Sequence, residues 1–590
     1  MIAAPSPAAL AAATAQVDRS LATGDLLLAF DQAAAHLEHF PEDEGLKHRG
    51  VLALARAGAT DRAAQLFAEW GLGASGEADI RALQARIAKD RALKLSGPAR
   101  REALLEAASL YRRIAETAPD RYPAINSASL TFLAGDTGGA ARIAKDVLAD
   151  PAIVRGADYW ALATRAEASL LVGGRSEASA ALGAAAQRPD ADAGARSSTR
   201  RQLRLILTAS GASAVEIEAV LAPIAPPLTL HYLDRGGPGW DVPSSADGER
   251  AAQKIIAASL ANLRPGAIFG SLGTPAEIIF AESALAAGIE LTIVLPVPEA
   301  AFAAHFTPDG GPEWQARFEH CCRTAHRIVD ASDDALSDDP GLTEHANRIA
   351  MGLALHRAQH LDGEAVGIVL APEGTAPGPV EAAWTRNGHR QIVLRLDSAG
   401  RRGAQAAFPR QSCAVIFGDL PGFSRLPEKY LPIFWDTVMG AIGDVLQERG
   451  EQVALSNTWG DAIHLVVPDV VAAAEICLAV QRRLNLIDGR VLGRDEPPTM
   501  RIGAHYGPVF AGWDPIAVQK TYYGRALSRA ARIEPITPPG TVYVTEAFAA
   551  TLLLESRGEF ACTYVGQVPL AKGFGTFRMY DLAAVAQLSA

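Results

Sequence analysis

Apolar residues recur every three to four positions across residues 1–215, a region rich in Ala, Leu, Arg and Glu and poor in β-branched runs. This spacing puts the apolar side chains on one face of a helix, so it predicts a stack of amphipathic helices. Gly24-Asp25 is followed 34 residues later by Gly58, and Ala29 by Ala63. Such a period predicts repeated helical pairs with a concave surface for a protein partner or for dimerisation. A generic helical bundle is the alternative.

Short apolar segments alternate with helical patterns from residue 228 to about 400, after the proline-rich residues 222–227. Residues 266–269 and 291–295 flank an amphipathic pattern over 275–287, which predicts a β-strand, a helix and a second, parallel strand. The loops 270–274 and 374–378 follow predicted strands, where open α/β sheets bind ligands and a helix N-terminus can receive a phosphate. Both loops could equally be tight turns. The polar residues 397–403 have linker chemistry and close this domain.

The last region begins with the continuous apolar run 413–417, which is broken at Gly418-Asp419. This pattern places the carboxylate of Asp419 at the end of a buried strand. A helix is expected from about Glu428 to Arg449, followed by strands over 452–455 and 462–467 with Asp461 at the tip of the hairpin. An aspartate in such a turn is often purely structural, so Asp461 alone says little about function.

Length, composition and charge indicate the number of domains and the general class of the protein. A chain of 590 residues is too long to fold around one hydrophobic core. It is expected to form three domains, residues 1–215, 228–400 and 406–590. Hydrophobic residues make up 49% and charged residues 21%, as in ordinary soluble proteins. The formal charge of −11 disfavours nucleic acid as a partner. We expect five reduced cysteines, no membrane span and a cytoplasmic location.

The first two regions carry two family resemblances. The repeated glycines and alanines of residues 1–215 resemble divergent tetratricopeptide repeats. Residues 270–278, 280–282 and 295–296 resemble the Rossmann-like domains, related to the SLOG group of nucleotide sensors, that accompany such repeats. Where those relatives tend to show Gly-Gly-Asp, this chain has Thr-Pro-Ala-Glu at 274–277. The resemblance implies an α/β domain with a sensory or scaffolding role.

Five motifs of the last region resemble the class III adenylate and guanylate cyclase catalytic domain. They occur in one order at residues 417–424, 460–461, 501–508, 523–532 and 571–573. The resemblance implies a ferredoxin-like α+β fold, a head-to-tail homodimer that shares its active sites, and attack of a ribose 3′-hydroxyl on the α-phosphate of the same nucleotide. The expected fold class is therefore multidomain, with an all-α helical repeat, an α/β Rossmann-like domain and an α+β cyclase domain.

The resemblance assigns the metal site to Asp419 and Asp461, with the backbone carbonyl of Leu420 completing one site. Two Mg²⁺ or Mn²⁺ ions would promote loss of the hydroxyl proton and offset negative charge on the phosphate oxygens. These cations prefer oxygen ligands and need few protein atoms, so two aspartates plus the triphosphate suffice.

The family motifs also place contacts to phosphate and ribose. Arg532 would stabilise the α-phosphate from the other protomer, and Lys572 would reach the terminal phosphates as a flexible point charge. Ser528 aligns with the transition-state asparagine of the family. Its shorter side chain would reach the ribose through water, which predicts slow turnover.

The base contacts depart from the family pattern. Asn457 replaces a lysine that reads adenine, Thr521 replaces a frequent aspartate, and Phe423 lies in the first motif as a further substrate contact. Thr521 favours adenine, so the leading hypothesis is an ATP-dependent cyclase that makes 3′,5′-cyclic AMP under control of the two preceding domains. Because Asn457 and Thr521 are uncharged, GTP or a pyrimidine triphosphate is the first alternative substrate. A nucleotide-binding sensor or scaffold with little turnover is the second alternative.

Overall fold

The computed structural model describes residues 6–117, 122–236, 246–305, 312–333, 339–396, 410–516 and 518–585. Contacts divide the described chain into two compact units. Unit 1 runs to Pro227 and includes Gln359–Gly363, whereas unit 2 holds Leu228–Ala358 and the described chain from Glu364 onward. The three-domain division of the sequence stays a prediction, and the expected linker 397–403 lies outside the described residues. Within these ranges, no helix combines the length and the apolar character that a membrane span requires.

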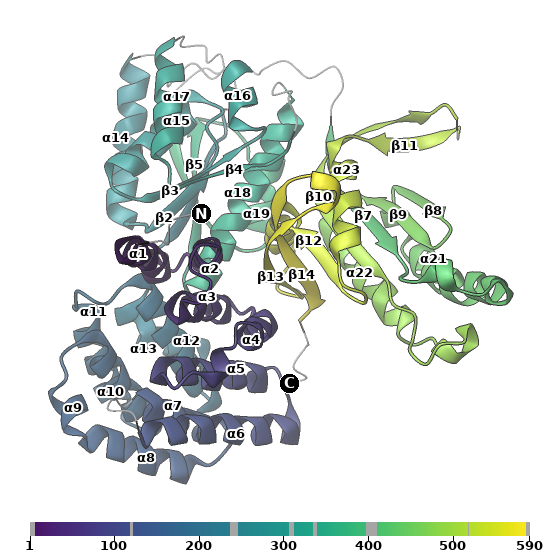
Figure 1. Cartoon of the computed structure of the whole chain (residues 1–590). Coiled ribbons are helices and arrows are strands. Elements are labelled where there is room, and N and C mark those ends of the chain that lie inside the picture. Colours follow the sequence, from purple (N-terminus) through teal and green to yellow (C-terminus); the bar gives the residue numbers. More distant parts are fainter. Residues whose placement is uncertain are drawn as a thin grey trace. The chain divides into compact units, whose positions relative to one another are not determined.

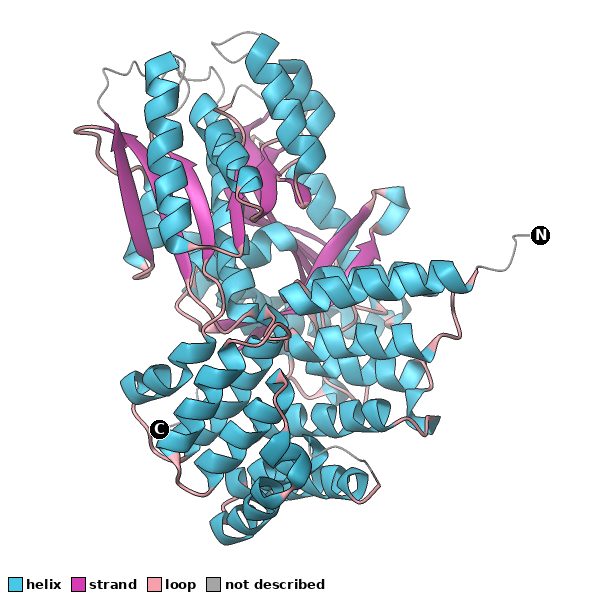
Figure 2. Cartoon of the chain, turned by 90° about the vertical axis from the view of Figure 1, so that its left-hand side faces the viewer, coloured by secondary structure: helices cyan, strands magenta, loops and turns pink. Residues whose placement is uncertain are grey.

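Unit 1 consists of helices joined by short connections, and consecutive helices pack against one another (Figure 2). Its helices are α1 (Pro7–Thr23), α2 (Leu26–Leu37), α3 (Glu44–Arg56), α4 (Thr60–Glu69), η1 (Leu72–Ala74), α5 (Ala78–Leu93), α6 (Gly97–Ala115), α7 (Tyr122–Leu133), α8 (Thr137–Ala149), α9 (Pro151–Arg155), α10 (Tyr159–Leu171), α11 (Arg175–Ala186), α12 (Ala193–Ala209), α13 (Ala214–Leu221) and η2 (Ala222–Ile224). The predicted helical N-terminal region is confirmed.

The glycines of the 34-residue spacing lie at helix junctions. Gly24 ends α1 with a φ of 78°, and the carboxylate of Asp25 then caps α2 by accepting a hydrogen bond from the N–H of Leu28 at 3.3 Å. Gly58, with a φ of 83°, lies between α3 and α4 in the same way. Left-handed backbone of this kind favours glycine, which explains why glycine recurs once per helical pair.

The first sheet of unit 2 is entirely parallel and has the strand order β4-β3-β2-β1-β5-β6 (Figure 1). Its strands are β1 (Thr229–Asp234), β2 (Ala267–Gly270), β3 (Glu290–Leu295), β4 (Arg327–Asp330), β5 (Ala365–Pro372) and β6 (Arg390–Leu396). The predicted unit of two parallel strands and a helix is β2, α15 (Pro275–Ala286) and β3, and it is confirmed.

Helices cover both faces of this parallel sheet. One face packs against α14 (Ala246–Leu263), α15 and α17 (Pro312–Thr324), with α16 (Glu299–His305) following β3. The other face packs against α18 (Pro340–His360) and α19 (Pro379–Arg386). Burial on both faces explains why the strands read as continuous apolar runs rather than as alternating patterns.

The second sheet of unit 2 has the order β13-β14-β12-β10-β7-β9-β8, and β11 pairs with the end of β10. Its strands are β7 (Gln411–Asp419), β8 (Leu455–Trp459), β9 (Ala462–Val467), β10 (Arg501–Asp514), β11 (Gln519–Tyr523), β12 (Val542–Thr545), β13 (Phe560–Pro569) and β14 (Thr576–Ala584). Its main helices are α21 (Gly440–Glu448), α22 (Val470–Leu484), α23 (Arg525–Ile533) and α24 (Glu546–Glu555). This mixed sheet with helices confirms the expected α+β class.

The helix predicted over residues 428–449 is interrupted in the structure. It divides into a 3-10 turn (Glu428–Tyr430), α20 (Leu431–Phe434), a π-helical segment (Trp435–Met439) and α21. Pro432 lies in the first turn of α20, where its missing N–H is tolerated, and so a new helical segment begins there. The strand expected from residue 452 starts only at Leu455, because Gly450–Gln452 form another 3-10 turn.

Helix α18 also packs against α24 on the side of the second sheet. A Cβ atom placed on Gly352 would lie 2.1 Å from the carbonyl oxygen of Ala550, so only glycine permits this approach of the two helices. Ion pairs flank the contact, including one between Arg348 and Glu555. The two sheets of unit 2 are thus joined through directly packed helices.

Candidate functional site

Asp419 and Asp461 meet at one edge of the second sheet. Asp419 is the last residue of β7, and Asp461 follows Gly460 in the turn between β8 and β9. Because β7 and β9 are antiparallel neighbours with Gly418 opposite Ile463, the end of β7 lies beside the start of β9. The two carboxyl groups lie close enough that the negative charge of Asp419 acts on Asp461. The predicted hairpin and the strand-end position of Asp419 are both confirmed.

The environment of Asp461 opposes its ionisation. Burial, and then the negative charge of Asp419, raise the pKa of the Asp461 carboxyl group to about 6. The backbone N–H groups of Asp461 and Leu420 act in the opposite direction and lower this pKa. Two carboxylates held this close repel each other unless a proton or a cation lies between them.

Arg501 and Glu534 complete the charged cluster. Arg501 begins β10 directly opposite Asp419, with which it forms an ion pair. Its Nη2 also lies 3.0 Å from Oε1 of Glu534, although without the alignment of a hydrogen bond. Burial raises the pKa of Glu534, and the nearby aspartates raise it further while Arg501 lowers it. The cluster therefore holds three carboxyl groups and one guanidinium, a balance that favours a bound divalent cation.

The donor atoms of this cluster fit magnesium or manganese. Both ions prefer oxygen ligands, which Asp419 and Asp461 supply, and Mg²⁺ usually takes only one or two protein carboxylates. The carbonyl of Leu420 accepts only a long hydrogen bond, 3.4 Å, from the N–H of Phe423, so a lone pair stays available. In the described part of the chain, no group of three or more His, Cys, Asp or Glu side chains is arranged to hold a metal. Water and substrate phosphates would have to complete the coordination of such an ion.

The residues expected to contact the base lie on neighbouring strands. Oδ1 of Asn457 on β8 accepts a hydrogen bond from Nε2 of Gln519 on β11 at 3.4 Å. Thr521 lies two residues further along β11, on the same face as Gln519. Phe423 approaches the hairpin turn, since its Cε1 lies 3.8 Å from the position of a Cβ on Gly460. The structure thus brings Asn457 to the strand of Thr521.

The remaining predicted residues lie elsewhere on the same domain. Ser528 and Arg532 are four residues apart on α23, which places them on one helix face. Lys572 is exposed in the 3-10 turn Ala571–Gly573 between β13 and β14, with a φ of 61°. Within the described ranges, none of the three forms a hydrogen bond or ion pair with Asp419 or Asp461.

Three residues at this site were not predicted from the sequence. Arg501 begins the motif at residues 501–508 and Glu534 follows the motif at 523–532, but the motifs give neither residue a role. Gln519 lies outside every motif, and only its contact with Asn457 marks it. The signal that finds all three is strand pairing, which places residues far apart in sequence side by side.

Comparisons with known proteins match two parts of the chain to family models. Residues 406–584 match the model of the adenylate and guanylate cyclase catalytic domain, and residues 29–131 match the Tetratricopeptide Repeats-Sensor model. An adenylate cyclase of Podospora anserina is 25% identical in an alignment of 204 residues that covers 30% of this chain and 9% of that protein. The chain therefore spans about a tenth of the length of this relative.

Two solved structures are similar over 30% of this chain. The adenylyl cyclase CyaB from P. aeruginosa is 17% identical, with a TM-score of 0.27 and 96% of that chain covered. The guanylate cyclase domain of RhGC from Catenaria anguillulae in complex with GTP is 22% identical, with a TM-score of 0.26 and 97% covered. By its matches to the family models, this chain carries a Tetratricopeptide Repeats-Sensor domain followed by a C-terminal domain of the adenylate and guanylate cyclase family.

Proposed function

We propose that the chain is a cyclase that converts ATP to 3′,5′-cyclic AMP and pyrophosphate, with Asp419 and Asp461 as its metal ligands. The crowding of these two carboxyl groups carries the proposal, since burial and Asp419 raise the pKa of Asp461 to about 6. A protein gains nothing in stability from partly buried carboxyl groups that repel each other. The arrangement is useful where a divalent cation occupies the space between them.

Each residue of the cluster has a distinct part in this proposal. The metal would be held by Asp419, Asp461 and the carbonyl of Leu420. When bound, it would stabilise negative charge on the phosphate oxygens and favour loss of the 3′-hydroxyl proton. Arg501 fixes the orientation of Asp419 through their ion pair. Glu534 in turn positions Arg501, because its carboxylate lies 3.0 Å from the guanidinium.

The phosphate contacts require a second copy of the domain. Ser528, Arg532 and Lys572 make no direct contact with the aspartate pair of their own chain in the described residues. In a head-to-tail homodimer the partner subunit supplies these side chains, so that Arg532 neutralises the α-phosphate and Lys572 the terminal phosphates. Activity should therefore rise with protein concentration in the range where dimers form.

Adenine is the base that the neighbouring strands suit. Asn457 and Gln519 both carry amides, which donate and accept hydrogen bonds as the Watson–Crick edge of adenine does. Thr521 adds a hydroxyl on the face that holds Gln519. Because these groups are uncharged, discrimination against guanine rests on geometry alone and should be modest.

The test is a substrate panel with products identified by mass. The purified chain is incubated with ATP, GTP, CTP or UTP in turn, each with Mn²⁺, and each reaction is repeated with EDTA. Cyclic AMP as the main product, absent with EDTA, is the expected result. A different cyclic nucleotide as the main product refutes the choice of base. Nucleotide binding without any cyclic product refutes the proposed enzymatic activity and favours a nucleotide-binding sensor. Ser528, which stands in place of the transition-state asparagine of the family, would then explain the lack of turnover.

A further inference from the structure

A cavity in unit 1 is lined by an unusual excess of positive charge. It lies where the end of α3 and the start of α4 meet α5 and α12, and its volume is about 730 Å³. Seven lysine and arginine side chains line it, against a single carboxylate, that of Asp90. This cavity plays no part in the site described above.

Two of the seven cations have carboxylate partners outside the cavity. Nζ of Lys94 lies 2.9 Å from Oδ2 of Asp61. Arg204 pairs with Asp362 at 2.8 Å and with Glu218 at 2.7 Å. These pairs offset the charges of Lys94 and Arg204. The cations further inside the cavity, here called the inner cations, are Arg56, Arg86, Lys89 and Arg201.

The inner cations are poorly paired. Nε of Arg56 has no hydrogen-bond partner in the described part of the chain. Nε of Arg86 lies 3.5 Å from Oδ2 of Asp90, and neither atom forms a hydrogen bond there. Lys89 is only 7% exposed, and its Nζ donates to the neutral Oε1 of Gln202 at 3.2 Å. Asp90 is thus the one carboxylate in the cavity wall beside these three cations, and other carboxylates act on them only from outside it.

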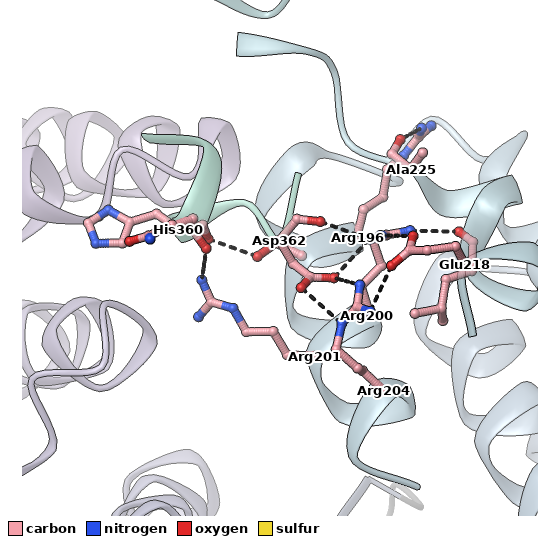
Figure 3. Close-up of polar contacts among 11 residues, drawn as sticks. Arg196, Arg200, Arg201, Arg204, Glu218, Ala225, His360 and Asp362 are labelled. Atoms are coloured by element: carbon pink, nitrogen blue, oxygen red, sulfur yellow. Dashed lines mark hydrogen bonds and ion pairs between the residues drawn. The ribbon is translucent and has the colours of Figure 1, made fainter. Parts of the chain in front are cut away.

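Arg201 adds a fourth inner cation whose partners are also uncharged. It donates to the backbone carbonyl oxygens of Arg56 and His360 and, at 3.3 Å, to that of Gln359. Figure 3 shows Arg201 directed towards His360, whereas Arg200 and Arg204 converge on the carboxylate of Asp362. Asp362 thus pairs with its two neighbours on α12, and its charge acts on Arg201 without outweighing burial and Arg86.

The inner cations repel one another. Burial and the charge of Arg86 lower the pKa of Arg56 to about 10, and the same two causes lower the pKa of Arg201 to about 10. Burial also lowers the pKa of Lys89, and Arg86 adds to this effect while Asp90 opposes it. Asp90 raises the pKa of Arg86 against burial. Without a counter-charge, so many buried cations destabilise the fold that holds them.

We infer that this cavity binds a phosphorylated small molecule of nucleotide size. The volume of about 730 Å³ falls in the usual range of small-molecule sites and is too small for a folded segment. Arginine presents a planar fork that matches phosphate oxygens, and several forks around one space suit a di- or triphosphate. Leu93, Leu133 and Leu205 on the wall offer apolar surface for the uncharged part of the ligand.

Binding is measured by calorimetry on the full chain carrying D419N and D461N, without divalent cations, so that the cyclase site contributes little. ATP and inorganic pyrophosphate are the probes, adenosine is the uncharged comparison, and polyglutamate represents an acidic peptide. We expect ATP and pyrophosphate to bind and adenosine not to bind. The variant R113Q is the control for the general effect of removing one positive charge, because Arg113 is exposed on α6.

R56Q and K89Q are the decisive variants. Each removes one charge-assisted contact, so each should weaken ATP binding at least about tenfold, whereas R113Q should not change it. The ligand-free melting temperature of R56Q and K89Q should stay the same or rise, because repulsion is relieved. Unchanged binding in both variants, no binding of either phosphorylated probe at millimolar concentration, or tighter binding of polyglutamate overturns the inference. So does a lowered ligand-free melting temperature in both variants, since the cations would then stabilise the fold.

Discussion

Glu546 joins the two sheets of unit 2 and offers the sharpest stability prediction. It begins α24, where it accepts hydrogen bonds from Nη2 of Arg327 on β4 at 2.7 Å and from Nη1 of Arg578 on β14 at 3.3 Å. Its side chain is 15% exposed. The variant E546Q keeps the size of the side chain and removes the charge on which both guanidinium groups converge.

The cost of E546Q can be worked out from the pKa of Glu546. Burial alone would raise this pKa, but Arg327 and Arg578 outweigh burial and lower it from the ordinary 4.5 to about 2. That difference corresponds to roughly 3 kcal/mol of folding free energy at neutral pH. The value agrees with the roughly 3–5 kcal/mol that is typical when one partner of a buried ion pair is removed.

The sign of the pH dependence follows from the lowered pKa. Stability from the ionised carboxylate is fully present above the unfolded pKa of 4.5 and is lost as the pH falls towards about 2. The difference in unfolding free energy between wild type and E546Q should therefore be roughly 3 kcal/mol at neutral pH and roughly 2 kcal/mol near pH 3.5.

Urea unfolding of the full chain at several pH values measures this difference. The matched control is E451Q, because Glu451 is exposed and should change stability by less than about 0.5 kcal/mol. An E546Q variant as stable as E451Q would show that the Arg327–Glu546–Arg578 contact contributes nothing. A gap that widens on acidification would refute the assigned direction of the pKa shift.

Two further substitutions probe unit 2. G352A should destabilise it by about 1–3 kcal/mol in urea, because a Cβ would lie 2.1 Å from the Ala550 carbonyl. The control G443A on α21 should be neutral or stabilising, because a Cβ there meets no atom within 4 Å. Equal stability of both variants would argue against close packing of α18 and α24. D333N should lower the free energy of unfolding by about 2 kcal/mol and lower turnover, because Asp333 pairs with the buried Arg529 of α23. If D333N keeps full stability and full activity, Asp333 does not position α23.

The local parts of the fold could be predicted from the sequence, and the long-range parts could not. The strand ending at Asp419 and the hairpin carrying Asp461 both follow from short apolar runs and turn residues. The place of Arg501 beside Asp419 depends instead on the pairing of β7 with β10, which no local pattern encodes. The approach of Gly352 to Ala550 joins residues about 200 positions apart, so it was equally hidden.

The charged cavity shows the same limit in unit 1. Helical periodicity predicts that α3, α5 and α12 exist, but Arg56, Arg86 and Arg201 each look like ordinary helix-surface arginines in the sequence. Only the packing of the three helices turns these side chains towards one space. The helix predicted over 428–449 failed for a local reason, because Pro432 and the π-helical segment interrupt a pattern that is otherwise helical.

The most direct test of the central claim compares ATP turnover by wild type, D419N and D461N in the presence of Mn²⁺, with cyclic AMP measured by mass. D436N serves as the matched control, because Asp436 is exposed in the π-helical segment. Loss of a metal ligand should lower the rate at least about a hundredfold in D419N and D461N, with melting temperatures close to wild type, and D436N should be fully active. Wild-type rates in both D419N and D461N would contradict the assignment of these two aspartates as the metal site.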